Sequence, residues 1–479
     1  MSEYQQLING QWCGAVSGDV WELVNPSTES VIDSVPFGDG RDATAAIDAA
    51  AGAQAQWAAV GPYGRAEILH RAADLLHDRA ESYGAVMTEE SGKPLGQSVA
   101  EWRSAPNYLR YAADEAKRIG GRIIPSRAPN RRIDVTYRPV GVVGVISAWN
   151  FPVYNINRAV ASALAAGCTV VVRPSEFTPR SAFLYAATLA DAGVPPGVIN
   201  VINGEPHAIA QTMLSDPRLH KMQFTGSTRV GKILMDGASR TVTDLSLELG
   251  GNAPVIVMPD VHDIEAIARS GVEAKYRNGG QVCIAPQRFL VHSAIVDEFT
   301  NVVRSESARK SVGDPMLSDT DIGPLINDDQ RSRVESIVQS SVDTGATVET
   351  GGTRVGGPGF FYQPTVLSGD LSGTAVMTEE VFGPVLPITS FDLLDEALEI
   401  ANSVEHGLTA FVWTAGLETA IEASERLDYG MVGVNDWYPV TAEAPFGGVK
   451  QSGLGRESGT EGILEYLEPK TRFFGGLST

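Results

Sequence analysis

Cys283 is the residue of this chain whose surroundings point most directly to chemistry. It lies in KYRNGGQVCIAPQR, residues 275–288, directly after the run Gly279, Gly280 and Gln281. Adjacent glycines indicate a tight loop rather than a packed helix or strand. A cysteine in a loop is accessible, and its thiolate is a strong nucleophile. The local sequence therefore favours a reactive cysteine over the alternative, a buried structural one.

Glu248 is a candidate general base. It stands between leucines and ahead of two glycines in LSLELGGNAP, residues 245–254. Apolar surroundings raise the pKa of a carboxyl group, which suits it to take a proton near neutral pH. The glycines allow a ligand to approach the backbone closely. A helix-capping or ion-paired glutamate is the alternative that remains open.

A third segment has the form of a phosphate-binding turn. In KMQFTGSTRVGKILM, residues 221–235, an apolar run ends at Phe224 and is followed by Gly226 and Ser227 before a helical pattern begins. Backbone N–H groups at such a helix start bind anions, assisted by the helix dipole. The dinucleotide fingerprint G-x-G-x-x-G is absent here. An ordinary helix cap is therefore the competing interpretation.

Glu176 follows another apolar run in VVVRPSEFTP, residues 170–179. Dinucleotide-binding folds place an acidic residue just beyond the carboxyl end of a strand, where it binds ribose hydroxyls. Arg173 ends the run, and Pro174 prevents its simple continuation as a strand. A solvated loop acid is the alternative.

The elements that must position these residues form an α/β fold. The first ~120 residues are mainly helical, with Ile68, Leu69, Ala72, Leu75 and Leu76 at helical spacing between residues 64 and 79. From residue 136, short β-branched runs alternate with helical segments, which predicts a parallel, doubly wound sheet. A second such series follows Gly251. Because 479 residues are too many for one core, two doubly wound α/β domains are expected.

Composition excludes several classes of protein. The net charge of -21 argues against nucleic acid and anionic membranes as partners. Three widely spaced cysteines indicate a reducing compartment, the cytoplasm, rather than a disulfide framework. The start lacks the pattern of a signal peptide, and the longest apolar run is too short to cross a bilayer. The seven histidines are scattered, so no metal site is expected.

Seven motifs taken together resemble those of the NAD(P)-dependent aldehyde dehydrogenases. They occur in the family's order and cover nearly the whole chain. Glu248 and Cys283 are 283 − 248 = 35 positions apart, close to the usual interval in that family. The matching stretches are WNFP at 149–152, RPSEFTP at 173–179, FTGST at 224–228, ELGG at 248–251, GGQVC at 279–283, EEVFGPV at 379–385 and PFGGVKQSGLGRE at 445–457.

The resemblance implies three parts in the chain. An NAD(P)-binding domain is expected from residues 1–120 and 139–249, and a catalytic domain from residues 250–450. Residues 121–138 and 467–479 are expected to form a small β oligomerisation element. A homodimer or homotetramer follows from that expectation.

The resemblance also implies a mechanism. The Cys283 thiolate attacks the carbon of a small aldehyde, and the Asn150 amide with the Cys283 N–H holds the oxyanion. Hydride transfer to the nicotinamide leaves a thioester, which Glu248 hydrolyses by activating water. The cofactor is expected to be NAD, with NADP possible, since Glu176 repels a 2′-phosphate while Arg173 and Ser175 favour one. The expected cofactor-binding residues are Ile146, Ser147, Trp149, Arg173, Ser175, Glu176, Gly226, Ser227, Leu249, Glu380 and Phe382.

Within the family, the chain is most similar to succinate-semialdehyde dehydrogenases. Arg158 and Arg277 match the two arginines with which those enzymes bind a substrate carboxylate. Thr441 is expected to supply a hydroxyl. The alternative is that either arginine pairs with a protein carboxylate. Aromatic or other small aldehydes are the alternative substrates, with Trp437 and Tyr438 lining the pocket.

The chain departs from the family pattern at positions near the cofactor. Ala148 and Arg173 stand where proline and lysine are usual. Ala159 stands where many members have a lysine that forms a proton path with the glutamate matching Glu457. The proton exit route is therefore left open by the sequence.

Overall fold

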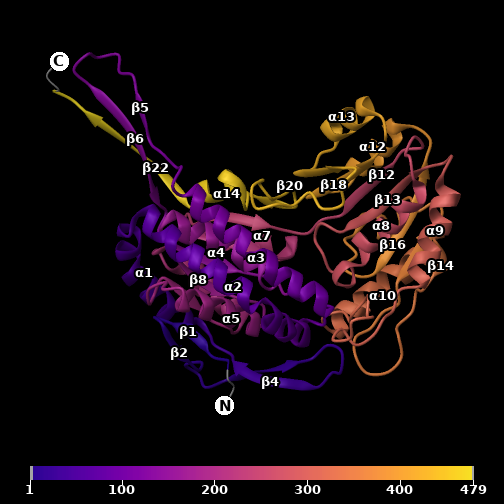
Figure 1. The fold of residues 1–479 in the computed structure, drawn as a ribbon, viewed down its shortest axis with the longest axis horizontal. Coiled ribbons are helices and arrows are strands. Elements are labelled where there is room, and N and C mark those ends of the chain that lie inside the picture. Colours follow the sequence, from indigo (N-terminus) through magenta and orange to yellow (C-terminus); the bar gives the residue numbers. More distant parts are fainter. Residues whose placement is uncertain (1–3, 477–479) are drawn as a thin grey trace.

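Two α/β lobes lie side by side in the computed structural model, which describes residues 4–476 (Figure 1). The first lobe is built on an eight-stranded sheet of order β2-β1-β9-β8-β7-β10-β11-β21. Its centre consists of parallel strands, β7 (Val142–Ile146), β8 (Thr169–Arg173), β9 (Ile199–Val201), β10 (Leu219–Thr225) and β11 (Asp244–Glu248). The strands β1 (Gln6–Ile8), β2 (Gln11–Cys13) and β21 (Gly453–Leu454) add antiparallel edges.

Alternate residues of the central strands face two different cores. Val143 and Val145 of β7 pack into one apolar cluster, whereas Val142 and Ile146 pack into the other. Burial on both faces explains why these strands are continuous apolar runs. The first cluster includes helices α2 (Gly61–Ser91), α3 (Leu95–Glu115), α4 (Tyr154–Ala166) and α5 (Pro179–Asp191). The second includes α1 (Gly40–Ala59), α6 (Pro206–Ser215) and α7 (Thr228–Ala238).

The second lobe repeats this layering on a seven-stranded sheet of order β14-β15-β16-β13-β12-β18-β19. All neighbouring pairs are parallel except β14 with β15. Its strands are β12 (Ala253–Val257), β13 (Pro286–His292), β14 (Thr347–Thr350), β15 (Thr365–Ser368), β16 (Val385–Phe391), β18 (Thr409–Trp413) and β19 (Met431–Val434).

Helices cover both faces of the second sheet. One core includes α8 (Ile264–Tyr276) and α9 (Val296–Ala308). The other includes α10 (Asp328–Asp343), α11 (Ala375–Thr378), α12 (Leu394–Asn402) and α13 (Leu417–Arg426). The prediction of two doubly wound α/β units is therefore confirmed.

A narrow three-stranded sheet projects from the first lobe (Figure 1). It contains β5 (Arg122–Ile124), β6 (Arg132–Pro139) and β22 (Leu467–Phe474). The strand β22 runs antiparallel to β6, from Leu467 opposite Pro139 to Phe474 opposite Arg132. The expected small β element thus forms from the two predicted segments, although residues 477–479 lie outside the described residues. Its role in oligomerisation stays a prediction.

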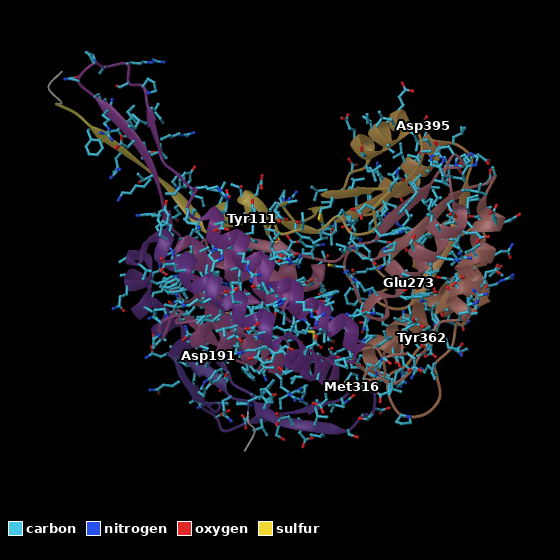
Figure 2. All side chains as sticks on the ribbon, in the orientation of Figure 1. Tyr111, Asp191, Glu273, Met316, Tyr362 and Asp395 are labelled. Carbon is cyan, nitrogen blue, oxygen red and sulfur yellow. The ribbon has the colours of Figure 1, made fainter. Side chains whose placement is uncertain are left out.

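Several segments tie the two lobes together. After the second lobe, β20 (Val449–Lys450) pairs with β17 (His406–Gly407), and then β21 and α14 (Gly459–Leu464) return to the first lobe. The hairpin of β3 (Val20–Val24) and β4 (Val31–Pro36) reaches the second lobe, where Phe360 N donates to Pro26 O at 2.9 Å. Leu95 N donates to Pro315 O at 2.9 Å, next to Met316, which Figure 2 labels near the junction. No helix within residues 4–476 is long and apolar enough to cross a membrane.

Candidate active site

The first sheet contributes the carboxyl ends of its strands. The strand order reverses between β7 and β10, and such a switch point leaves a crevice beyond the strand ends. Ile146 lies opposite Phe224, and Thr225 lies opposite Glu248, so the three strands end at similar levels. The segments that follow β7 and β10 contain Asn150 and Ser227 respectively. Register therefore brings the predicted base and the predicted oxyanion donor to one edge.

The second sheet contributes the segments that precede its strands. Cys283 lies in the turn between the 3-10 helix η1 (Arg277–Gly280) and β13. Asn278 has a φ of 51°, and Gly280 has a φ of 75°. A Cβ at Gly280 would lie 2.1 Å from the carbonyl oxygen of Gly383, so only glycine fits. This close approach joins the cysteine turn to the segment that carries Glu380 and Phe382.

Helix α3 fixes both segments of the site from one side. The Glu101 carboxylate accepts hydrogen bonds from Val153 N at 2.9 Å and Tyr154 N at 3.1 Å, which anchors the start of α4. Lys93 pairs with Glu101, and both side chains are fully buried. The Gln97 Oε1 atom accepts a hydrogen bond from Asn278 N at 2.8 Å. These buried and partly buried contacts hold the Asn150 segment and the cysteine turn in fixed relation.

Two cavities meet at Cys283. The cofactor-side cavity, of about 250 Å³, is lined by Ala148, Trp149, Asn150, Arg158, Thr225, Gly226, Ser227, Glu248, Leu249, Gly250, Cys283, Gln330, Arg333, Glu380, Phe382 and Phe446. The substrate-side cavity, of about 200 Å³, is lined by Tyr108, Phe151, Tyr154, Asn155, Arg158, Arg277, Val282, Cys283, Ile284, Tyr438, Val440 and Phe446. The thiol is therefore reachable from two sides.

The cysteine thiol is not ionised without assistance. Cys283 is half-buried, and burial raises the pKa of its thiol to about 12. The Arg158 guanidinium acts in the opposite direction, whereas the carboxylates of Glu380 and Glu248 raise the pKa further. Thiolate formation thus depends on nearby positive charge or on a base.

Glu248 has the properties expected of a buried base. It is 4% exposed, and its Oε2 atom has no hydrogen-bond partner among the described residues. Burial raises the pKa of this carboxyl well above its usual range, and the neighbouring carboxylate of Glu457 raises it further. The guanidinium groups of Arg158 and Arg456 oppose this shift. A carboxyl with a raised pKa accepts a proton from water near neutral pH.

Asn150 is joined directly to the cysteine turn. It is 5% exposed, and its Nδ2 atom donates to the carbonyl oxygen of Gln281 at 3.0 Å. Its own carbonyl oxygen accepts a hydrogen bond from the Asn278 Nδ2 at 2.9 Å. The side-chain amide therefore lies beside Cys283, as an oxyanion donor must.

Six predicted cofactor-binding residues line the cofactor-side cavity, namely Trp149, Gly226, Ser227, Leu249, Glu380 and Phe382. Ser227 also caps α7, because its Oγ atom accepts a hydrogen bond from Val230 N at 3.4 Å. Glu380 accepts a hydrogen bond from Gly251 N at 3.0 Å. The ring of Phe382 packs edge-on against Trp149, with centroids 5.5 Å apart.

The other five, Ile146, Ser147, Arg173, Ser175 and Glu176, lie outside this cavity lining, at or just beyond the ends of β7 and β8. Arg173 donates to the Glu176 carboxylate and to Gly204 O, both at 2.8 Å. The buried Ser147 hydroxyl has no hydrogen-bond partner within residues 4–476. A polar atom left in this way fits a site for a bound polar molecule.

Arg277 is the charged group most available to a substrate. Its guanidinium lies between the rings of Phe151 and Tyr438, 5.2 Å from each centroid. No aspartate or glutamate within residues 4–476 forms an ion pair with it. It lines the cavity that contains Cys283.

Arg158 differs from Arg277, because its charge is balanced within the protein. Its Nε atom lies 2.9 Å from the Glu457 carboxylate, and its guanidinium lies over the Phe446 ring at 3.9 Å. Arg158 lines both cavities, as expected of a substrate residue. For this arginine, the structure shows the pairing with a protein carboxylate that was the alternative to a substrate role.

The prediction that Trp437 and Tyr438 line an aromatic pocket is partly wrong. Trp437 is 6% exposed, packs against Trp413 and Phe411, and donates from Nε1 to Ser270 Oγ at 2.9 Å. It is therefore part of the core, and of these two residues Tyr438 alone lines the cavity.

Thr441 is exposed, hydrogen-bonds to the Glu443 carboxylate and lines neither cavity. This placement does not bring its hydroxyl to the site.

Sequence reasoning missed several residues of the substrate-side cavity. Phe151 and Tyr154 follow Asn150 closely, and Tyr108 comes from α3. Asn155 lies on α4, three positions before Arg158. Residues three apart share a helix face, so this spacing offered a signal.

Comparison with known proteins gives the class. Residues 12–472 match the model of the Aldehyde dehydrogenase family. The chain belongs to this family. It is an oxidoreductase that oxidises aldehydes with NAD(P).

Individual relatives match almost the whole chain. A succinate-semialdehyde dehydrogenase of Paenarthrobacter nicotinovorans is 43% identical over 426 residues, which are 89% of this chain and 94% of that protein. The mitochondrial succinate-semialdehyde dehydrogenase of Arabidopsis thaliana is 42% identical, with 99% and 90% covered. The crystal structure of an NADP-dependent enzyme of E. coli matches with a TM-score of 0.97 and 37% identity, over 99% of this chain and 98% of that one.

Proposed function

We propose that this protein oxidises a short aldehyde that carries a carboxylate, such as succinic semialdehyde, to the corresponding acid. The observation that carries the proposal is Arg277, a cation in the wall of the cavity that holds Cys283, with no carboxylate of the described residues to balance it. Two relatives given above are succinate-semialdehyde dehydrogenases, which supports the same substrate. Thr441 is left out of the proposed site.

The cavity suits a short anionic molecule. A guanidinium recognises a carboxylate through paired, charge-assisted hydrogen bonds. Aromatic walls around the guanidinium screen such bonds from water, and removing one partner then costs about 2–5 kcal/mol. That cost corresponds to roughly 30- to 5,000-fold in kcat/KM. A four-carbon semialdehyde would place its carboxylate at Arg277 while its carbonyl group reaches Cys283.

The residues of the site act in sequence. The Cys283 thiolate forms a bond to the aldehyde carbon, and the Asn150 Nδ2 with the Cys283 N–H stabilises the oxyanion. When bound, NAD(P) supplies the acceptor for the hydride. Cys283 then carries the acyl group as a thioester, and Glu248 takes a proton from the water that attacks it. The acid leaves, and the thiolate is restored.

The first-lobe domain, residues 1–120 and 139–249, is proposed to bind NAD(P), and residues 250–450 to form the catalytic domain. Trp149, Glu380, Phe382 and the start of α7 would hold the nicotinamide and phosphate portions. Ile146, Ser147, Ser175 and Leu249 complete the proposed set. NAD is the proposed preference, because Arg173 is already bonded to Glu176 and Gly204 O, while Glu176 faces a 2′-phosphate with like charge.

Subunit contact is proposed for the projecting sheet. Ile123 is 66% exposed and Phe473 is 57% exposed. Exposed large apolar side chains on a projecting sheet indicate a surface that another protein covers. A homodimer or homotetramer would cover them.

A cytoplasmic location is also proposed, on the strength of three free, widely spaced cysteines.

Aromatic aldehydes with an acidic substituent are a second candidate. Five aromatic rings line the substrate-side cavity, and a benzene ring would stack among them. The five are Tyr108, Phe151, Tyr154, Tyr438 and Phe446.

Arg277→Leu tests the proposed substrate class. The kcat/KM for succinic semialdehyde should fall by at least about 30-fold, while that for butyraldehyde, which lacks the carboxylate, stays within about threefold. Arg277→Lys is the matched control and should recover part of the loss, since it keeps the charge without the planar fork. Equal losses for both aldehydes would overturn the assignment of Arg277 to the substrate carboxylate.

A further inference from the structure

Asn155 connects Arg158 to the side-chain amide of Asn150. Asn155 lies at the start of α4 and is 3% exposed. Its Nδ2 atom donates to the Asn150 Oδ1 at 3.1 Å and to the Ala148 carbonyl oxygen at 3.4 Å. Its Oδ1 atom accepts a hydrogen bond from the Arg158 Nη2 at 3.3 Å. The three side chains therefore form one chain of hydrogen bonds beside Cys283.

The direction of this chain is fixed by Arg158. A guanidinium only donates hydrogen bonds, so the Asn155 amide must turn its oxygen toward Arg158 and its nitrogen toward Asn150. The oxygen of Asn150 must then be the acceptor, which turns the Asn150 nitrogen toward the cysteine turn. There it donates to Gln281 O at 3.0 Å. Reversing either amide would place two donors or two acceptors face to face in a buried site.

Arg158 itself is anchored. Its Nε atom lies 2.9 Å from the Glu457 carboxylate, and Gln223 Nε2 donates to that carboxylate at 2.8 Å. The residues Arg158, Asn155 and Asn150 are 7% exposed or less, so water does not readily replace these bonds. Arg158, the first member of this chain of hydrogen bonds, is therefore held in place before substrate arrives.

We infer that Asn155 is a positioning residue that holds the Asn150 amide with its nitrogen, rather than its oxygen, toward the carbonyl oxygen of the aldehyde. The inference rests on the proposed role of Asn150 as the oxyanion donor. Without Asn155, the Asn150 amide loses the donor that faces its oxygen and keeps the hydrogen bond to Gln281 O. Its reversed state, which presents an oxygen to the developing negative charge, then becomes more populated. Arg158 then serves the reaction through Asn155 rather than through the substrate carboxylate.

The test compares two variants in the holoenzyme. Asn155→Leu keeps the number and branching of the side-chain heavy atoms without polar atoms. Asn155→Asp offers only acceptors, which pair with Arg158 and attract the Asn150 nitrogen. Loss of one oxyanion donor costs about 10²- to 10³-fold in kcat. Loss of its orientation should therefore slow the burst of NADH by about tenfold to hundredfold, and the effect of Asp should be the larger. The KM for the aldehyde should change by less than about threefold.

Alkylation of Cys283 by iodoacetamide separates positioning from general damage. This displacement reaction forms no oxyanion, so the Asn155→Leu variant should be alkylated at the wild-type rate. A parallel fall in alkylation and in the burst would show a structural effect and overturn the inference. Asn155→Ala gives the same comparison if the leucine variant does not fold. For Asn155→Asp, the pH dependence of alkylation measures any effect of the added charge on the thiol.

The Asn150→Ala background decides whether Asn155 acts through Asn150. In that background, Asn155→Leu should cause no further slowing of the burst, because the amide that it positions is gone. Independent, multiplying losses would overturn the inference. An Asn150→Ala variant with wild-type burst would instead refute the oxyanion role of Asn150. A slow Asn150→Ala variant beside a wild-type Asn155→Leu variant would refute the positioning role alone.

Discussion

The two cavities that meet at Cys283 differ in the charged groups that line them. The cofactor-side cavity is lined by charged groups of both signs, the carboxyl groups of Glu248 and Glu380 and the guanidinium groups of Arg158 and Arg333. The substrate-side cavity has no aspartate or glutamate among its lining residues within residues 4–476, and has Arg277 instead. The mixed charges of one side suit a cofactor that carries both a cationic nicotinamide and anionic phosphates, and the other side suits an anionic substrate. The Cys283 thiol lies where the two cavities meet, so it can contact a substrate in one cavity and a cofactor in the other.

The cavities also differ in how their charges are balanced. On the cofactor side, Glu380 accepts a backbone hydrogen bond, and the shared residue Arg158 pairs with Glu457. On the substrate side, Arg277 lies against two aromatic rings and has no ion-pair partner within residues 4–476. A cation without an internal partner gains most from a ligand that supplies one. The difference supports the proposal that Arg277 selects the substrate.

Replacing the shared thiol should have the largest effect, because it removes the point where the two cavities meet. Cys283→Ala should lower kcat by at least about 10⁴-fold, as loss of a nucleophile does in other covalent enzymes. NAD affinity, measured by quenching of protein fluorescence, should stay within about twofold, since the cofactor-side carboxylates remain. Cys13→Ala is the control and should retain activity. Appreciable aldehyde oxidation by Cys283→Ala would return this cysteine to a structural role.

Glu248→Gln should separate the first half of the reaction from the second. A neutral amide cannot take a proton from water, so steady-state turnover should fall by about 10²- to 10⁴-fold. The initial burst of NADH should remain close to that of the wild type, because bond formation at Cys283 and hydride transfer do not require this base. Stopped-flow absorbance records both phases. An equal loss in both would give Glu248 another role.

The cofactor side should prefer NAD over NADP. Glu176 is proposed to accept hydrogen bonds from ribose hydroxyls and to repel a 2′-phosphate, whereas Arg173 already donates a hydrogen bond to Glu176. The kcat/KM should be higher with NAD by about tenfold, and Glu176→Gln should reduce that ratio. A higher kcat/KM with NADP in the wild type would show that Arg173 and Ser175 dominate instead.

The smallest expected effect is a pH dependence of cofactor binding. Burial raises the pKa of Glu380 to about 7, although the Gly251 N–H, Arg333 and Lys275 oppose the shift. Below pH 7 the carboxyl becomes protonated and loses one acceptor for a ribose hydroxyl, so NAD affinity should fall by several-fold toward pH 6. It should be constant above pH 8. Isothermal titration across this range measures the change.

Lys275 provides the control for that titration, because burial lowers its pKa to about 7 as well. Glu380→Gln should abolish the pH dependence of NAD affinity, whereas Lys275→Met should leave a dependence of the same sign. If Lys275→Met alone removes it, the lysine rather than the carboxyl controls binding.

The sequence predicted most of the residues that line the cofactor-side cavity and fewer of those that line the substrate-side cavity. Apolar runs such as TVVVR and HKMQFT form β8 and β10 because their pattern is local, and the turn at Ser227 follows directly. The pairing of Arg158 with Glu457 joins distant parts of the chain, and no local pattern contains it. Trp437 was misplaced for a related reason. Its burial against Trp413 depends on how the loop after β19 folds back on the core.

Asn155 shows a further limit of sequence reasoning. An asparagine at the start of a helix is ordinarily explained as solvent-exposed or as a cap. Its role here depends on which neighbour donates and which accepts, and only the packed structure gives that order. Motifs locate reactive groups, whereas the contacts that orient them come from tertiary packing.

One competition experiment tests most directly the claim that Cys283 joins a cofactor side to an acid-binding side. The Glu248→Gln protein is mixed with NAD and equal concentrations of succinic semialdehyde and butyraldehyde, quenched in acid and examined by peptide mass spectrometry. We expect an acyl group on the peptide that contains Cys283, with succinyl exceeding butyryl by at least about tenfold. Equal amounts of the two acyl groups, or acylation of a peptide that lacks Cys283, would contradict it.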